Sequence, residues 1–541
     1  MRRLLVILLC IISVFDVCSQ TTSLEQKLVK ALLYVDSRTF EANQRANSYI
    51  ADQFSRGYYS EVLKYSKLYL QNKRQMVEQM YAVLSEQERA DLTILVEGDL
   101  VFHYILSAAY HTEDYSVMGD VYDYLLFAKQ LLLRTTKQRK NALPPHTVTW
   151  RDVQKQLGNG EAAIEFVRFN VFEGEKIKSL RMYAALVMTQ DSNCPILIPM
   201  ATEKNLTLWQ LHDPSDLYAV DKYGAALSQL VWLDILYYLS QQEVTTVYFA
   251  PSGVLNQIAI ESLPYDKEST VSYHFNLTRL SSTRELVNKH NLYPAKSAML
   301  YGDLFYRASA ETMQQAQTRS AVGTLPYSKP EVEGIARLLY DKQYRVNVLT
   351  QKQGTEASFK ALSGKSPSIL HLSTHGFVNR PIEGDAMQRS GLIMAFGARA
   401  WEGKTVPQNT EDGILTAAEI ATLDLSGTDI VVLSACNTAL GDITTEGVWG
   451  LQRAFKLAGV QTIVMSLWQV DDQATAVFMQ YFYEALLQGR QTFAKAVARD
   501  TEIAEDIFDY PHGALSTAKR RMQRHPQYSA PYYWAGFIVV D

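Results

Sequence analysis

The chain has 541 residues, more than one compact core usually holds, because folding units contain about 100 to 200 residues. Hydrophobic residues make up 47% and charged residues 20%, a balance typical of folded domains and not of disordered or collagen-like chains. The formal net charge is -5 and no basic stripe appears, which argues against nucleic acid as a partner.

Residues 1–19 have the pattern of a secretory signal peptide. The positive start Met1–Arg3 is followed by the apolar run Leu4–Phe15 and a small polar cluster that suits cleavage before Gln20. The run is shorter than the roughly 20 residues of a bilayer span, and no later run is that long, so we expect no transmembrane span. We predict export to the periplasm or the extracellular space, with lipid anchoring through Cys18 the less favoured alternative.

Residues 20–145 are predicted to form an all-α domain. Apolar residues recur at helical spacing between Leu24 and Lys140, where there is no proline. Two similar Tyr-Ser turns, at 54–60 and 110–116, lie too far apart for tetratricopeptide repeats of about 34 residues, so we expect degenerate helical hairpins. We expect these helices to recruit a protein partner and to be dispensable for solubility. The alternative is a bundle that packs on the rest of the chain and holds it together.

Beyond Pro145 short apolar runs alternate with helical patterns. The predicted strands are Ala162–Val167, Met182–Met188, Val247–Ala250, Ala298–Tyr301, Ile369–Leu372, Leu392–Ala395, Ile430–Leu433 and Thr462–Leu467. The predicted helices are Gly224–Leu239, Lys329–Leu339, Thr355–Leu362, Glu446–Ala458 and Gln473–Leu487. Strands separated by helices indicate a mainly parallel sheet flanked by helices, whose functional site lies outside the carboxyl ends of the strands.

Two of these strands end in reactive side chains. One predicted strand leads into His375-Gly376 and another into Cys436, so both groups are expected at the same edge of the sheet. A cysteine attacks as the thiolate, and a neighbouring imidazole can take its proton and later return it to a leaving amine. The backbone N–H groups of Gly376 and Cys436 are candidates to hold the oxyanion of a tetrahedral intermediate.

Structural interpretations compete with this one. A cysteine at a strand end is more often a small buried hydrophobe than a nucleophile, but the paired His-Gly favours the nucleophile for Cys436. His371 lies inside its strand, where packing or hydrogen bonding explains it, and a metal pair with His375 would need a helix. Cys194 has no nearby His-Gly and is expected to be structural. We predict no metal and no cofactor.

Four segments in this order resemble the CHAT domain, a caspase- and separase-related family of cysteine peptidases often fused to tetratricopeptide repeats. They are Ser373-Thr374-His375-Gly376, Asp412-Gly413-Ile414-Leu415-Thr416-Ala417-Ala418-Glu419-Ile420, Leu433-Ser434-Ala435-Cys436-Asn437-Thr438, and Glu446-Gly447 leading to Ser466-Leu467-Trp468-Gln469-Val470-Asp471-Asp472. The resemblance extends from Trp150 to Asp541.

The resemblance implies a caspase-like α/β fold with an inactive half, residues 146–293, followed by a catalytic half, residues 294–541. It makes His375 the general base and Cys436 the nucleophile. The caspase Gln-Ala-Cys signature is absent, because Ser434 precedes Ala435, so a preference for aspartate does not carry over.

Substrate preference is also implied by the resemblance. In separase-like relatives an acidic residue after the Ser-Leu-Trp strand lines the pocket that receives arginine. Asp472 matches that residue better than Asp471. A partly desolvated carboxylate binds guanidinium through two parallel hydrogen bonds, so we expect cleavage after arginine and then lysine. The alternative is that both aspartates cap the helix that begins near Gln473.

The sequence therefore predicts an exported CHAT-type cysteine endopeptidase that cleaves polypeptides. The alternative, from a different class, is a protease-like fold kept as a catalytically silent scaffold or binding module. The intact pair of His375 and Cys436 favours the enzyme, because a scaffold has no need of both.

Overall fold

The computed structural model describes residues 35–81, 99–129, 148–173, 176–207, 213–287, 296–306, 322–378, 386–403, 411–435, 442–444, 447–498 and 510–541. The predicted signal peptide with Cys18 and the predicted nucleophile Cys436 lie outside these residues. Among the helices of the described part, none is both long and apolar enough to cross a membrane.

The N-terminal region is helical, as the sequence predicts. Its long helices are α3 (Ser37–Ser55), α4 (Tyr59–Tyr81), α6 (Leu100–Thr112) and α7 (Met118–Ala128). Acidic side chains cap two of them: Asp36 accepts from the backbone N–H of Thr39 at 2.9 Å, and Asp99 accepts from that of Val101 at 3.1 Å. The two Tyr-Ser segments lie at the turns between α3 and α4 and between α6 and α7. The helices α3 and α4 pack along each other as a hairpin, whereas α6 and α7 each pack against α4.

The first sheet has five strands in a mixed arrangement. In spatial order they are β3 (Ile196–Thr202), β2 (Lys176–Thr189), β1 (Glu161–Glu173), β4 (Thr246–Ala250) and β5 (Asn276–Arg279). β1 pairs antiparallel with β2, and β2 with β3, while β4 and β5 run parallel to β1 and to each other. The first sheet is therefore less parallel than expected. A direct hairpin joins β1 and β2, whereas two parallel strands would need a crossover helix between them.

Both faces of the first sheet are buried. Side chains of β1 alternate between the faces, so Ile164 and Phe166 pack with Trp232 of α11 (Ala225–Gln241). Val167 and Phe169 point the other way and join the buried core of the N-terminal helices. This packing argues against the expectation that these helices are dispensable for solubility, since their removal would expose one apolar face of the sheet. The alternative interpretation, in which the bundle supports the core, is the one the packing favours.

A buried ion pair joins the helices to this sheet. The Lys129 ammonium, just after α7, lies 2.6 Å from the Glu165 carboxylate of β1, and both side chains are almost fully buried. The ammonium also donates to the carbonyl oxygens of Ala250 and Pro251. The other carboxylate oxygen accepts from the backbone N–H and the hydroxyl of Thr283. Breaking such a pair is costly because it leaves one charge buried without its counter-ion.

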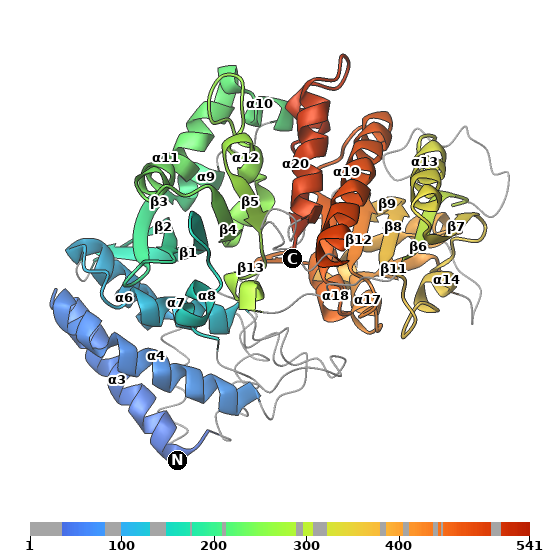
Figure 1. Cartoon of the computed structure of the whole chain (residues 1–541). Helices are drawn as coiled ribbons and strands as arrows, with labels where there is room; N and C mark the ends of the chain where they lie inside the picture. Colours follow the sequence, from blue (N-terminus) through green and yellow to red (C-terminus); the bar gives the residue numbers. More distant parts are fainter. Residues whose placement is uncertain are drawn as a thin grey trace.

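The second sheet has six strands and is mainly parallel. In spatial order they are β16 (Phe537–Val540), β15 (Thr462–Ser466), β12 (Ile430–Ser434), β8 (Ile369–Ser373), β6 (Ser297–Leu304) and β7 (Arg345–Gln351). The flanking helices are α13 (Ser328–Asp341), α14 (Glu356–Lys360), α17 (Ala417–Ala421), α18 (Leu451–Leu457), α19 (Asp472–Ala498) and α20 (Tyr510–Gln523). Only the β15–β16 pair is antiparallel, and α13 and α19 lie on the opposite face from α14, α17 and α18 (Figure 1).

One predicted helix differs in its start. The sequence predicts a helix from Glu446, but α18 begins only at Leu451. Residues 447–449 instead form β14 (Gly447–Trp449), which pairs with β13 (Asp442–Thr444) in a two-stranded ribbon. Local helical periodicity is overridden here by pairing with a preceding strand.

The two sheets meet at β5 and β16. The backbone N–H of Ser281 donates to the carbonyl oxygen of Asp541 at 3.0 Å, and the N–H of Asp541 donates to that of Arg279 at 3.4 Å. The Arg279 guanidinium also forms a buried ion pair of 2.8 Å with Glu261. Buried Lys519 of α20 lies nearby, where burial lowers its pKa to about 8. One apolar core runs through both halves, and α20 stands between them (Figure 1).

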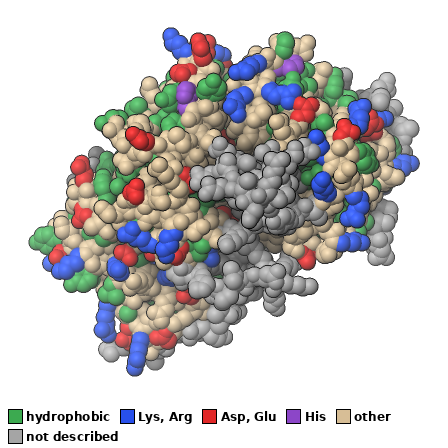
Figure 2. All heavy atoms as spheres, viewed as in Figure 1, with side chains coloured by type: hydrophobic (Ala, Val, Ile, Leu, Met, Phe, Trp, Pro, Cys, Tyr) green, Lys and Arg blue, Asp and Glu red, His purple; other side chains and the backbone are tan. Residues whose placement is uncertain are grey.

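The surface mixes charges of both signs. On the face drawn in Figure 2, Lys and Arg side chains are scattered among Asp and Glu side chains. This distribution agrees with the net charge of -5 and lacks, among the residues described on that face, the basic stripe of a nucleic-acid-binding surface.

We expect Lys129→Met to lower the free energy of unfolding by about 3 to 5 kcal/mol, because it leaves the Glu165 charge buried and unpaired. Adding Glu165→Gln should recover part of the loss, since the amide oxygen can still accept from Thr283. Urea or thermal unfolding followed by circular dichroism measures both effects. A single variant as stable as the parent would show that the pair does not hold the helices to the sheet.

Candidate functional site

A small sheet continues the large one at its carboxyl edge. Its strands are β9 (His375–Phe377), β10 (Gly391–Ile393) and β11 (Ile414–Thr416). Thr374 separates β8 from β9, and its hydroxyl contacts the Tyr306 hydroxyl at 2.9 Å and donates to the carbonyl oxygen of Ile393. This buried anchor fixes the point where the chain leaves β8, so His375 emerges at a defined position opposite Ile393.

The His375 imidazole has a defined tautomer. Its Nε2 lies 2.8 Å from the backbone carbonyl oxygen of Gly323, and a carbonyl only accepts, so Nε2 carries the hydrogen in this contact. In the neutral ring Nδ1 is then unprotonated and free to act as a base. Burial lowers the pKa of His375 below its ordinary value, and the Tyr306 ring packs against it with centroids 5.0 Å apart. At neutral pH the ring is therefore a base held in a fixed orientation.

The strand that leads to Cys436 is the neighbour of the strand that leads to His375. β8 and β12 are parallel and in register, with Ser373 opposite Ser434. His375 and Cys436 each follow these residues by two positions in the sequence. Cys436 itself lies outside the described residues, but the last described residue before it, Ala435, is held by the Ser466 hydroxyl, which donates to its carbonyl oxygen at 2.9 Å.

Gly376 lies in a strand, where the sequence had indicated an open turn. It is the middle residue of β9, opposite Leu392 of β10, and is partly exposed. Its role in holding an oxyanion stays a prediction.

His371 belongs to the interior. It is fully buried in β8, with Nε2 3.0 Å from the Glu331 carboxylate of α13 and Nδ1 3.2 Å from the Tyr483 hydroxyl of α19. The second Glu331 oxygen accepts from the Ser373 hydroxyl at 2.9 Å. His371 and His375 thus have separate partners, and the buried network clamps α13 onto β8.

The segment that leads into α13, residues 323–328, links several strand ends, and we name it the strap; its last residue, Ser328, is the first of α13. Besides Gly323, which binds His375, it contains Ser328, whose buried hydroxyl accepts from the backbone N–H of Asp303 at 2.9 Å and donates to the carbonyl oxygen of Ser373 at 3.0 Å. The strap therefore ties the ends of β6 and β8 to the first turn of α13.

The two candidate pocket residues have different roles. Asp471 caps α19, since its carboxylate accepts from the backbone N–H of Ala474 at 2.8 Å, as the capping interpretation holds. Asp472 turns to the strap and accepts from the N–H of Tyr327 at 2.9 Å. Burial raises the pKa of its half-buried carboxyl, and this hydrogen bond opposes the rise. Capping of α19 thus accounts for Asp471 alone.

Asp303 is an acidic residue that the sequence analysis did not find. It lies in β6 near its carboxyl end with φ of 52°, a left-handed conformation that is uncommon outside glycine and often marks functional sites. Burial raises the pKa of the Tyr306 phenol, and the negative charges of Asp472 and Asp303 add to the rise. Both carboxylates thus lie near the ring that packs on His375. No sequence pattern signals a strained backbone, which explains the omission.

Comparison with known proteins identifies the family of the chain. A model of the family described as CHAT domain matches residues 221–541, more than half of the chain. The chain belongs to the CHAT domain family. The match begins inside the first half, later than the expected Trp150.

The CHAT chain also resembles tetratricopeptide repeat protein 28. Identity is 33% over 127 residues with the protein of Mus musculus and 32% with that of Homo sapiens, spanning 24% of this chain but only 4% of either relative. Among solved structures, the Saccharomyces cerevisiae separase–securin complex aligns with a TM-score of 0.47 at 9% identity, covering 98% of this chain and 41% of that one. The Arg-specific cysteine proteinase gingipain R aligns with a TM-score of 0.35 at 10% identity, covering 60% and 69%. Both scores are below 0.5, so these likenesses say nothing about the site.

The second CHAT segment, from Asp412 to Ile420, proves to be structural. Gly413 has φ of +78°, and an added Cβ would lie 2.5 Å from the Gly397 backbone, so no larger residue fits. Thr416 and Glu419 form a capping box at the start of α17. The segment thereby builds β11 and α17, which support β10 and, through it, the strand of His375.

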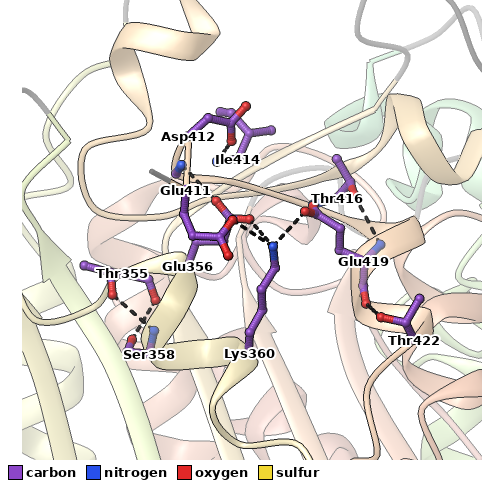
Figure 3. A network of polar contacts seen from close by, with 11 residues as sticks. Thr355, Glu356, Ser358, Lys360, Glu411, Asp412, Ile414, Thr416, Glu419 and Thr422 are labelled. Atoms are coloured by element: carbon purple, nitrogen blue, oxygen red, sulfur yellow. Dashed lines mark hydrogen bonds and ion pairs between the residues drawn. The ribbon is translucent and has the colours of Figure 1, made fainter. Parts of the chain in front are cut away.

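A lysine binds three carboxylates behind this segment (Figure 3). The Lys360 ammonium lies 2.6 Å from Glu356, 2.8 Å from Glu419 and 2.9 Å from Glu411. These carboxylates lie within 4.8 Å of one another, and the ammonium supplies the positive charge that a metal ion could bring to such a group. Glu356 also accepts from the backbone N–H of Gly413 at 2.9 Å. Burial raises the pKa of Glu356 to about 8, so this carboxyl is protonated at neutral pH.

Glu356→Gln is expected to change how stability depends on pH. The folded protein keeps the Glu356 proton up to about pH 8, whereas the unfolded chain loses it near 4.5, so this group's stabilising contribution declines as pH rises between those values. The glutamine variant cannot lose that proton, so it should gain thermal stability relative to the parent between pH 5 and 9. Glu411→Gln is the control, because Lys360 lowers the pKa of Glu411. A difference between variant and parent that is constant with pH would contradict this assignment.

Proposed function

We propose that this CHAT protein is a cysteine endopeptidase that cleaves polypeptides with Cys436 as nucleophile and His375 as general base. The observation that supports it most strongly is the orientation of His375. A neutral imidazole is held through Nε2 by the Gly323 carbonyl, at the end of the strand next to the one that leads to Cys436. A catalytically silent scaffold gives no reason for this arrangement, although it stays the alternative.

The proposed reaction uses these groups in sequence. Nδ1 of His375 takes the proton of the Cys436 thiol, and the sulfur attacks the carbonyl carbon of the scissile bond. The Gly323 carbonyl stabilises the imidazolium, and the N–H groups of Gly376 and Cys436 are the proposed donors to the oxyanion. The C–N bond breaks as the leaving amine receives the proton from Nδ1. Water, deprotonated by His375, then hydrolyses the thioester.

We further propose that the residue before the cut is basic. Asp472 and Asp303 both bind the strap, Asp472 through its carboxylate and Asp303 through its backbone N–H, and the negative charges of both act on Tyr306, which packs on His375. One oxygen of Asp472 receives the Tyr327 N–H, and the other is available to a guanidinium. The planar guanidinium of arginine can donate to the Asp472 and Asp303 carboxylates at the same time. The ammonium of lysine is a point charge and fits these two acceptors less well.

Location and partners complete the proposal. The pattern of residues 1–19 supports export, and the N-terminal helices α3, α4, α6 and α7 offer a surface to a protein partner, as helical-hairpin arrays do. Because these helices also cover the first sheet, binding there would act on a part of the same folded unit.

Cys436→Ala and His375→Ala should each abolish cleavage of a diverse peptide library, and the double variant should match either single one, because the two groups act as a unit. Labelling of Cys436 by iodoacetamide should keep its rate down to pH values below 6.5, since the lowered pKa leaves His375 neutral there. Full activity of purified Cys436→Ala would overturn the enzyme in favour of the scaffold.

Asp472→Asn should reduce kcat/KM for substrates with arginine before the cut by about 100-fold or more, because the variant removes a partly desolvated charge partner. Iodoacetamide labelling of Cys436 should be unaffected. Asp471→Asn is the matched control: asparagine caps a helix as well as aspartate does, so its cleavage should resemble the parent's. A cleavage profile with acidic or purely apolar residues before the cut would exclude this pocket.

A further inference from the structure

The loop between β15 and α19, residues 467–471, is held by a segment remote in sequence. Nε1 of Trp468 donates to the carbonyl oxygen of Tyr532 at 3.0 Å. The hydroxyl of Tyr532 donates in return to the carbonyl oxygen of Gln469 at 2.8 Å. These reciprocal bonds fix the loop immediately before Asp472, the residue that turns to the strap.

The Trp468 ring is also braced by the first half of the chain. Tyr218, which follows α10 (Pro214–Leu217), packs against it with ring centroids 5.3 Å apart and an interplanar angle of 34°. Tyr218 is itself fixed, because its buried hydroxyl accepts from the backbone N–H of Ala259 at 2.9 Å. Gly536 lies so close to the Trp468 ring that an added Cβ would approach it to 2.7 Å. The indole therefore has little room to move.

We propose that the first half of the α/β region, residues 146–293, sets substrate choice by positioning this loop. Tyr218 braces Trp468, and Trp468 fixes the backbone that presents Asp472. This inference rests on the proposed function and extends it. Trp468 and Tyr218 are positioning residues, since neither is among the proposed reacting groups. The half that contributes neither His375 nor Cys436 thereby gains a role in selecting the basic residue.

The physical reason is that selection of arginine depends on geometry more than thiol reactivity does. A charge-assisted hydrogen bond from a guanidinium to the available oxygen of Asp472 requires that carboxylate at a defined distance and angle. A displacement of about 1 Å at such a group can cost up to about 100-fold in rate. His375 is held by Gly323 of the strap and by the pairing of β9 with β10, and Ser328 anchors the strap to Asp303 and Ser373 apart from its bond to Asp472, so loosening the loop should leave the base in place.

The experiment compares three probes on the full chain. Peptidyl acyloxymethyl ketones with arginine or norleucine before the reactive group report selectivity, and iodoacetamide reports the reactivity of Cys436. In Tyr218→Ala we expect the arginine-to-norleucine ratio of labelling rates to fall about tenfold, with iodoacetamide labelling changed by less than about twofold. Tyr218→Phe keeps the ring on Trp468 and should retain most of the ratio.

A second pair of variants guards against misfolding of Tyr218→Ala. Gly536→Ala pushes a methyl group into the Trp468 ring and should also lower the ratio, whereas Gly513→Ala in α20, where nothing lies within 4 Å of the added Cβ, should not. An unchanged ratio in folded Tyr218→Ala or Gly536→Ala overturns this inference and leaves the proposed function standing. A parent that does not prefer the arginine probe overturns the basic specificity and the inference together, and a Cys436 that iodoacetamide does not label overturns the enzyme.

Discussion

The candidate site depends first on the parallel pairing of β8 with β12. Two adjacent strands in register end at the same level, so residues that follow them by equal numbers start from neighbouring positions. Ser373 faces Ser434 across this pair, and His375 and Cys436 follow each by two residues. The strands are buried on both faces, and a shift of register by one residue would exchange side chains between the two faces and take His371 away from Glu331. The core therefore fixes the spacing of the reactive residues.

The strap orients the His375 ring, whose position the strand spacing sets. A strand end alone would leave the His375 ring free to rotate, but the Gly323 carbonyl selects one tautomer. The strap is fixed in turn by Ser328, which binds the ends of β6 and β8, and by α13, which the Glu331–His371 contact holds to the sheet. A buried histidine with no proposed part in the chemistry thus supports the one that has such a part, because His371 holds α13 to β8, and the strap that leads into α13 binds His375 at the start of β9.

The rest of the chain packs against the second sheet and so supports its carboxyl edge. The N-terminal helices cover one face of the first sheet and are tied to it by Lys129 and Glu165. The first sheet joins the second through β5 and β16, and its Tyr218 reaches the loop before Asp472. One apolar core extends through both halves, so a disturbance in the first half can reach the candidate pocket without crossing a flexible linker.

The sequence by itself determined the helical and α/β character of the chain, its CHAT family and most buried strands, because apolar periodicity and strand-end motifs are local patterns. It also identified His371 as an interior residue. Only the tertiary structure decided that β1 and β2 form a hairpin, that Asp471 caps α19 while Asp472 turns to the strap, and that Asp303 lies near Tyr306. The contact of Asp472 with Tyr327 joins residues far apart in the chain, and the other features depend on backbone geometry that no sequence motif marks. The binding of His375 by Gly323 is the clearest case, because a backbone carbonyl has no side-chain signature and only folding brings it within 2.8 Å of the ring.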